Sequence, residues 1–186
     1  MKQNKGYTLV EVIIVIAIMA ILSGMSFVTL GVIKQAKCNT AVQNLNDQIA
    51  SLLVKTKAVS EAKDEKLCLL IRQNTAGAVT YADGTTAKKN TFSVILGTED
   101  GVSFTEKEAD TAEVTLTELV TIDYTPSDSA QLCPVSGVDQ SSYMIIEFNK
   151  ANGSVRYGAG DYKFIYNGLT IATVHLDAAT GSHKVK

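Results

Sequence analysis

The chain has 186 residues, a formal net charge of -2 and a hydrophobic fraction of 46%. This length predicts one modest globular domain with an appendage. The small negative charge argues against a general nucleic-acid surface, because no large excess of lysine and arginine is present to neutralise phosphates. Three cysteines are too few for a disulfide-built scaffold, and more than about 100 residues beyond the N-terminal segment can bury a core without one.

The N-terminal segment contains a long uncharged run from Val12 to Ile33. At about 1.5 Å rise per residue, a helix over this run is about 33 Å long, which is enough to cross a bilayer. Lys2 and Lys5 precede the run, and this placement predicts a cytoplasmic N-terminus with the rest of the chain translocated. Glu11 lies at the edge of the run, where a carboxylate is costly, so we expect it to have a function.

Two ordinary kinds of N-terminal segment, a signal peptide and a plain signal anchor, match this sequence only in part. A secretory signal peptide has an apolar stretch of about 7–15 residues and a small-residue cleavage site. Here the stretch is longer, and Lys34 follows it without an Ala-x-Ala pattern. A plain signal anchor explains the length and the lysines, but it explains neither Glu11 nor the glycine at position 6.

The sequence KGYTLVE, from Lys5 to Glu11, resembles the processing site of type IV prepilins and pseudopilins. The pattern in that family is a short basic leader ending in glycine, then an aromatic residue, Thr, Leu, a small aliphatic residue and Glu, followed by a long apolar run. Tyr7 departs mildly from the usual phenylalanine. The motif is specific because all of these features must fall in register.

The resemblance implies that a membrane aspartyl peptidase cuts after Gly6 and that the new N-terminus, on Tyr7, is N-methylated. It further implies that Glu11 of one subunit meets the Tyr7 amine of its neighbour in a filament. Pairing offsets the desolvation cost of both charges and sets the register of the subunits. The implied partners are other pilins, the prepilin peptidase, the assembly platform with its ATPase, and the membrane.

Beyond the membrane run, apolar residues continue at steps of three and four, which is typical of one face of a helix. The members of this stripe are Cys38, Val42, Leu45, Ile49, Leu52 or Leu53, and Thr56. The pattern predicts an amphipathic helix to about Glu61, with its apolar stripe packed on the following domain. A coiled-coil dimer is the alternative, although the stripe spans only about three heptads.

From Lys66 onward the pattern changes to short strands bounded by turn residues. The predicted strands are Leu67–Arg72, Val79–Tyr81, Phe92–Leu96, Val114–Tyr124, Tyr143–Phe148, Ser154–Tyr157, Tyr162–Tyr166, Thr170–Leu176 and Ser182–Val185. Asn152-Gly153 and Asn167-Gly168 predict two-residue hairpin turns, and Asp177–Gly181 closes the last hairpin. The C-terminal third is therefore predicted to be an antiparallel meander.

The predicted fold class is α+β, with a long N-terminal helix packed on an antiparallel β-sheet headgroup. The resemblance to pilins implies the pilin fold. The predicted divisions are a leader at 1–6, a transmembrane and filament-core helix at 7–34, an amphipathic helix at 35–62 and the headgroup at 63–186. Within the headgroup, Met144–Phe148, Asn152–Ser154, Ile171–Val174 and Thr180-Gly181 resemble the H-type minor pseudopilins and FimT-like minor pilins.

The remaining candidate sites are weaker. In a translocated domain, Cys68 and Cys133 are the favoured disulfide pair, whereas Cys38 is expected to be a small apolar residue between helix and domain. The acidic stretch Thr98–Glu118 is predicted to be a solvated loop with a strand edge. His175 is expected to face solvent, and together with His183 it lacks a third metal ligand.

The prediction is a structural filament subunit without a cofactor, and not an enzyme. It is a single-pass cytoplasmic membrane protein before assembly and part of an extracellular or cell-surface filament afterwards. No nucleic-acid partner is expected, since Lys88-Lys89, Lys184 and Lys186 are the only basic hints of a role in DNA uptake. The alternative is a membrane-anchored extracellular enzyme or receptor with a plain signal anchor.

Overall fold

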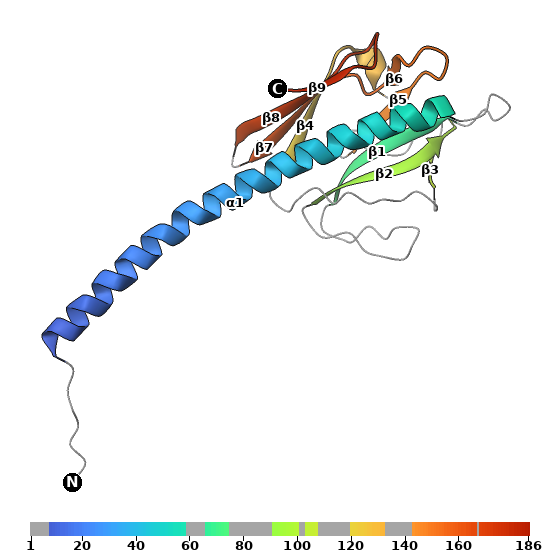
Figure 1. The fold of residues 1–186 in the computed structure, drawn as a ribbon. Helices are drawn as coiled ribbons and strands as arrows, with labels where there is room; N and C mark the ends of the chain where they lie inside the picture. The colour runs from blue at the N-terminus through green and yellow to red at the C-terminus, as the bar shows by residue number, and fades with distance from the viewer. Residues whose placement is uncertain are drawn as a thin grey trace. The chain divides into compact units, whose positions relative to one another are not determined.

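A computed structural model of the chain describes residues 8–58, 66–74, 91–100, 103–107, 120–132, 143–166 and 168–186. These residues contain a long helix, α1 (Leu9–Ala58), a short 3-10 helix, η2 (Ser129–Gln131), and antiparallel strands (Figure 1). The predicted α+β class is confirmed. The chain divides into two compact units, one ending at Lys37 and one beginning at Cys38.

Helix α1 contains no proline, so no backbone amide is lost and the helix continues unbroken to Ala58. Its second half carries the predicted apolar stripe, and the structure confirms it. Each member is at most 5% exposed: Cys38, Val42, Leu45, Ile49, Leu52 and Thr56. Val54, on the other side of the helix, is 67% exposed. The predicted end of the helix near Glu61 lies outside the described residues.

The strands form two sheets, and every pairing is antiparallel. The first has the order β3-β2-β1-β5-β6, with β1 Leu67–Asn74, β2 Thr91–Glu99, β3 Phe104–Glu106, β5 Tyr143–Phe148 and β6 Val155–Tyr157. The second has the order β4-β7-β8-β9, with β4 Thr121–Pro126, β7 Gly160–Tyr166, β8 Leu169–Leu176 and β9 His183–Val185.

The apolar stripe of α1 and one face of each sheet share a single core. At the centre of the first sheet, Leu69 lies opposite Leu96 on β2 and Ile146 on β5. Side chains on this face pack with the stripe, and the second sheet adds Ile122, Tyr162, Phe164, Ala172, Val174 and Leu176. Figure 1 shows the second half of α1 lying along β1 and β2. Each large side chain buried in this way contributes about 1.5–3 kcal/mol.

The predicted C-terminal meander is wrong, because β6 and β7 are consecutive strands in different sheets. The chain crosses between the sheets at residues 158–160. Gly158 has a φ of 91° and Gly160 a φ of 144°, conformations that glycine adopts at little cost. These two glycines redirect the chain within a short connection where a hairpin would otherwise continue.

Side chains from the second sheet and η2 hold this crossover in place. The Tyr162 hydroxyl donates to the Gly158 carbonyl at 2.5 Å, and the Tyr124 hydroxyl donates to the Ala159 carbonyl at 2.9 Å. Gln131 accepts from the Ala159 N–H through Oε1 and from the Gly158 N–H through its carbonyl. Burial raises the pKa of both tyrosines, so both phenols remain protonated donors.

Two of the three predicted turns are confirmed. Tyr166 and Leu169 pair directly, which leaves the two-residue connection at 167–168 between β7 and β8. Between β8 and β9, the Asp177 N–H donates to the Ser182 carbonyl at 2.9 Å and closes the last hairpin. Both turns arise from local sequence alone, which is why they could be predicted.

The turn between β5 and β6 is longer than the two residues predicted. The Asn149 N–H donates to the Ser154 carbonyl at 2.7 Å, and Asn152-Gly153 lie inside the loop that this bond closes. Asn152 Oδ1 accepts from the Ser154 N–H and hydroxyl at 3.0 and 2.8 Å. This side-chain turn competes with a tight hairpin, and the strand register shifts at Glu147/Phe148.

The other predicted strands correspond to observed ones, with two exceptions. Val79–Tyr81 and residues 114–119 of the predicted strand Val114–Tyr124 lie outside the described residues, and the C-terminal end of the latter overlaps β4. Neither β3 nor η2 was predicted. Each has three residues, and although β6 and β9 are as short, turn residues in the sequence mark those two strands.

Candidate functional site

Helix α1 begins with a reciprocal set of hydrogen bonds between Thr8 and Glu11. The Thr8 N–H and hydroxyl donate to Glu11 Oε2 at 2.9 and 2.8 Å, and the Glu11 N–H donates back to Thr8 Oγ1 at 3.3 Å. The Thr8 carbonyl accepts a bond from the Val12 N–H at 3.3 Å. This arrangement is a capping box, which satisfies amide groups that the start of a helix leaves unpaired. The Glu11 carboxylate is therefore held by its own chain.

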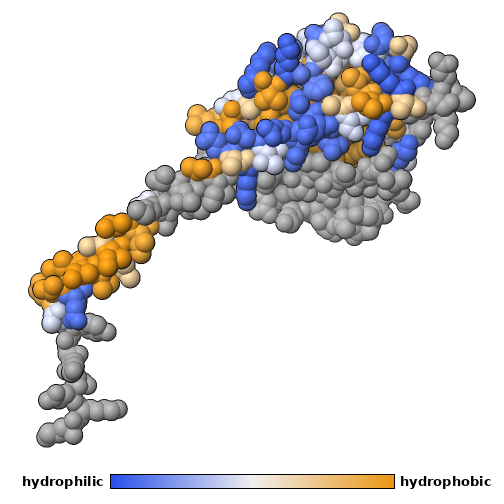
Figure 2. Space-filling view, viewed as in Figure 1, coloured by the Kyte–Doolittle hydropathy of each residue, from blue (hydrophilic) through white to orange (hydrophobic). Residues whose placement is uncertain are grey.

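The apolar side chains that follow Glu11 are exposed on every side of the helix. The large ones between Val12 and Leu22 are 50–62% exposed. Figure 2 shows hydrophobic residues over the visible face of this segment. A helix that is apolar all round is typical of one that is surrounded by lipid or by other protein. Among the helical residues that the structure describes, no segment meets the length and hydropathy needed to cross a membrane.

Of the residues predicted at the processing site, only Glu11 lies in the described part of the chain. Gly6 and Tyr7 lie outside it. Cleavage after Gly6, methylation of Tyr7 and the role of Glu11 in assembly therefore remain predictions.

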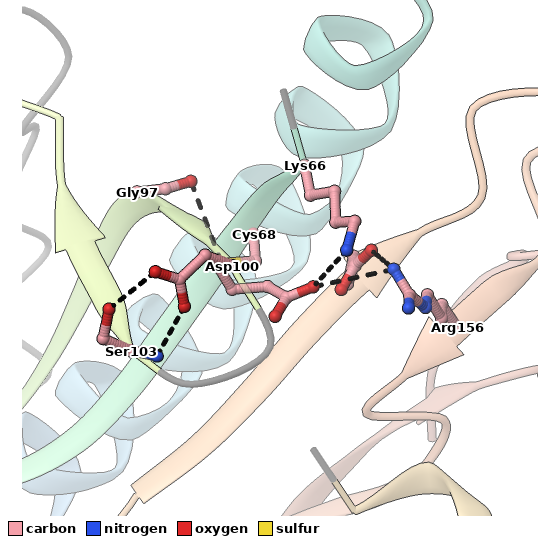
Figure 3. A network of polar contacts seen from close by, with 8 residues as sticks. Lys66, Cys68, Gly97, Asp100, Ser103 and Arg156 are labelled. Atoms are coloured by element: carbon pink, nitrogen blue, oxygen red, sulfur yellow. Dashed lines mark hydrogen bonds and ion pairs between the residues drawn. The ribbon is translucent and has the colours of Figure 1, made fainter. Parts of the chain in front are cut away.

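A separate charged cluster lies on the other face of the five-stranded sheet. Glu99 is 5% exposed and Glu147 is 3% exposed. Arg156 Nη1 lies 2.8 Å from Glu147 Oε1 and 3.6 Å from Glu99 Oε1, and Lys66 Nζ lies 3.7 Å from Glu99 Oε1. Figure 3 shows the side chains of Lys66 and Arg156 extending toward each other from opposite sides of these contacts. Sequence reasoning missed this cluster because its members lie on strands far apart in the chain.

The acidic stretch Thr98–Glu118, predicted to be a solvated loop with a strand edge, differs from that prediction at Glu99, which is buried. Residues 101–102 and 108–118 lie outside the described part of the chain. Strand β2 continues through Glu99, whose N–H donates to the Lys66 carbonyl at 3.2 Å. The sheet therefore carries this side chain into the interior. Burial raises the pKa of Glu147 to about 7, a shift that the bond from Arg156 opposes and the charge of Glu99 reinforces.

Two of the three cysteines, Cys38 and Cys68, lie in the described part of the chain. Cys38 is fully buried in the core as predicted, and burial raises the pKa of its thiol. Cys68, on β1, is also fully buried and donates to the Gly97 carbonyl at 3.8 Å. Cys133 lies outside the described residues, so the Cys68–Cys133 disulfide remains a prediction.

His175 lies on the polar face of the second sheet, as predicted. Its neighbours Val174 and Leu176 are fully buried, while His175 Nδ1 lies 2.6 Å from Asp161 Oδ1 on β7. His183 lies opposite Leu176 on β9. Within the described ranges, no group of three or more His, Cys, Asp or Glu side chains is placed to hold a metal ion.

The N-terminal segment matches a family model described as the prokaryotic N-terminal methylation motif, over residues 1–27. The chain carries the type IV pilin and pseudopilin signature. This signature includes Gly6, Tyr7 and Glu11 and ends within α1. No curated protein and no solved structure matches the chain. The match confirms the resemblance to type IV prepilins and leaves the H-type subgroup as a prediction.

The capping box within the motif could have been predicted from sequence. Thr8 and Glu11 have the Thr-x-x-Glu spacing of that arrangement and stand immediately before an apolar run. The spacing gives Thr8 a reason to be in the motif that is independent of processing.

Proposed function

We propose that the protein is a structural subunit of a type IV-type filament, either a pilin, a minor pilin or a pseudopilin. The observation that carries this proposal is the methylation motif at residues 1–27. In the proposal, the precursor is held in the cytoplasmic membrane by its N-terminal helix with the headgroup outside. Prepilin peptidase cuts after Gly6, and Tyr7 becomes the N-methylated first residue of the mature chain.

The exposed apolar surface of α1 supports this proposal. Side chains such as Ile13 and Ile16 are more than half exposed, and such a surface is stable only away from water. Lipid surrounds the helix before assembly, and the helices of neighbouring subunits surround it afterwards. The assembly platform and its ATPase transfer the subunit between these two environments.

Glu11 has two roles in this mechanism. In the subunit, its carboxylate caps α1 through Thr8. In the filament, the same carboxylate pairs with the Tyr7 amine of a neighbouring subunit. The bonds from Thr8 fix the Glu11 side chain before assembly, so less conformational entropy is lost when the pair forms.

Replacing Glu11 separates the two roles. Glu11→Gln keeps an amide oxygen that can complete the capping box but removes the charge. We expect normal processing and a loss of filament yield of at least about tenfold, because an unpaired buried amine costs several kcal/mol. Filaments recovered by shearing cells and quantified by immunoblot measure the yield.

Thr8→Ser is the matched control, because it keeps the hydroxyl of the capping box and every charge. It should assemble at the wild-type level. A wild-type yield from Glu11→Gln would show that the charge has no part in assembly and would favour the membrane-anchored enzyme or receptor.

A further inference from the structure

The charged cluster beside β6 has no part in the assembly mechanism. Two carboxyl groups, on Glu99 and Glu147, have side chains that are 1% and 4% exposed. Both lie within 3.6 Å of the same nitrogen, Nη1 of Arg156. Lys66 approaches only the Glu99 carboxylate.

Such an arrangement favours the binding of one proton between the two acids. Two ionised carboxylates that face each other away from water repel, and removal from water destabilises both charges. Arg156 and Lys66 have side chains that are 39% and 34% exposed, so water screens part of their attraction. A single shared proton removes one of the two buried negative charges. The remaining negative charge is paired with the guanidinium of Arg156.

Strand β6 depends on this contact more than a longer strand would. It has three residues and lies at the edge of the sheet. Only two residue pairs join it to β5, Glu147 with Tyr157 and Phe148 with Val155, and the register shifts between them. The bond from Arg156 to Glu147 therefore adds a side-chain link to a short ladder. The crossover at residues 158–160 follows immediately.

We propose that Glu99, Glu147 and Arg156 form a proton-dependent latch that holds β6 to the five-stranded sheet and loosens as the pH rises through neutrality. Below that range one proton removes one of the two negative charges, and Arg156, paired with the remaining charge, ties β6 to β5. Above it both carboxylates are charged, and separating β6 from the sheet lets water reach them.

The direction follows from proton linkage. The pKa of Glu147 is raised to about 7 in the folded protein, above its ordinary value of 4.5. The folded state therefore binds more protons between these two values, and the stabilisation is lost as the pH rises through 7. The titratable residues on the described strands around Glu147 are Cys68, Arg72, Glu99, Glu106, Tyr143, Arg156 and Tyr157, and Lys66 directly precedes β1.

Hydrogen exchange of the full-length chain in detergent micelles tests the latch. Peptides covering β6 are followed by mass spectrometry at about pH 5.5 and pH 8, with rates corrected for the intrinsic pH dependence of exchange. We expect the protection of β6 to fall by at least about tenfold between these values. Equal protection at both values would overturn the proposal.

Variants identify the groups responsible. Glu147→Gln is neutral and nearly isosteric, so β6 should keep the same protection at both pH values. Asp123→Asn, on an exposed position of β4, is the matched control and should retain the wild-type fall. A fall of wild-type size in Glu147→Gln would overturn the latch.

The melting temperature provides a second measurement on the same variant. At pH 8, Glu147→Gln should melt at a higher temperature than the wild type, because it lacks the second buried charge. A lower melting temperature, or failure to fold, would show that the ionised carboxylate is needed and would contradict the proposal.

Discussion

Replacing Ile49 by Ala should lower the free energy of unfolding of the unit that begins at Cys38 by about 2–5 kcal/mol. Ile49 is fully buried and lies in the core shared by α1 and both sheets. Truncation removes apolar contacts and leaves a cavity that the sheets cannot fill without moving. Urea unfolding of the full chain in micelles, followed by circular dichroism, measures the change.

Val54→Ala is the matched control on the same helix. Val54 is 67% exposed, so its truncation should change stability by no more than about 0.5 kcal/mol. Equal losses from the two variants would mean that the stripe containing Ile49 does not face the core, which would contradict the helix packing described above.

Replacing Gly158 by Ala should destabilise the same unit by at least about 3 kcal/mol. Its φ of 91° is unfavourable for a side chain, and a Cβ there would lie 2.5 Å from the Ile145 carbonyl and 2.9 Å from Tyr162 Oη. The backbone atoms of β5 must move to relieve the contact. Because Tyr162 donates to the Gly158 carbonyl, the crossover between the sheets is disturbed as well.

Gly168→Ala separates the effect of backbone conformation from that of crowding. Gly168 has a φ of 76°, and a Cβ there would meet no atom within 4 Å. Its substitution should therefore cost only about 1–2 kcal/mol, the penalty of a left-handed conformation. If thermal unfolding of the full chain shows equal losses for the two variants, the close approach at Gly158 contributes nothing.

The parts of the fold that were predicted correctly depend on local patterns. The stripe from Cys38 to Thr56 follows from helical periodicity, and the β7–β8 turn follows from Asn-Gly chemistry. The strand positions follow from alternation and turn residues. Each of these signals lies within a few neighbouring residues, and tertiary packing reinforced rather than replaced it.

The parts that were missed depend on residues distant in sequence. At Gly158 and Gly160 the chain passes into the second sheet. Hydrogen bonds from Tyr124 and Tyr162, and one accepted by Gln131, hold this crossover in place. No turn motif in the sequence predicts these hydrogen bonds to the crossover. Likewise Glu99 is a charged residue in an acidic stretch, and only the assembly of β2, β1, β5 and β6 into one sheet places it beside Lys66 and Arg156. Cross-strand position cannot be read from a single charged residue.

The N-terminal site also has features set by local sequence and one feature set by a distant partner. The motif from Lys5 to Glu11 is contiguous, so its resemblance to prepilins could be recognised in the sequence. The capping box between Thr8 and Glu11 is equally local, yet it becomes evident as a second role of the carboxylate only when the atoms are placed. The contact with a neighbouring subunit depends on a second chain, and the filament yield of Glu11→Gln tests it.

Intact mass and N-terminal peptide mapping of the protein recovered from cells test the central claim most directly. The account predicts a mature chain that begins at N-methylated Tyr7, with residues 1–6 removed. A chain that keeps Met1 to Gly6, in cells with an active prepilin peptidase, would contradict the filament proposal and favour a plain membrane anchor.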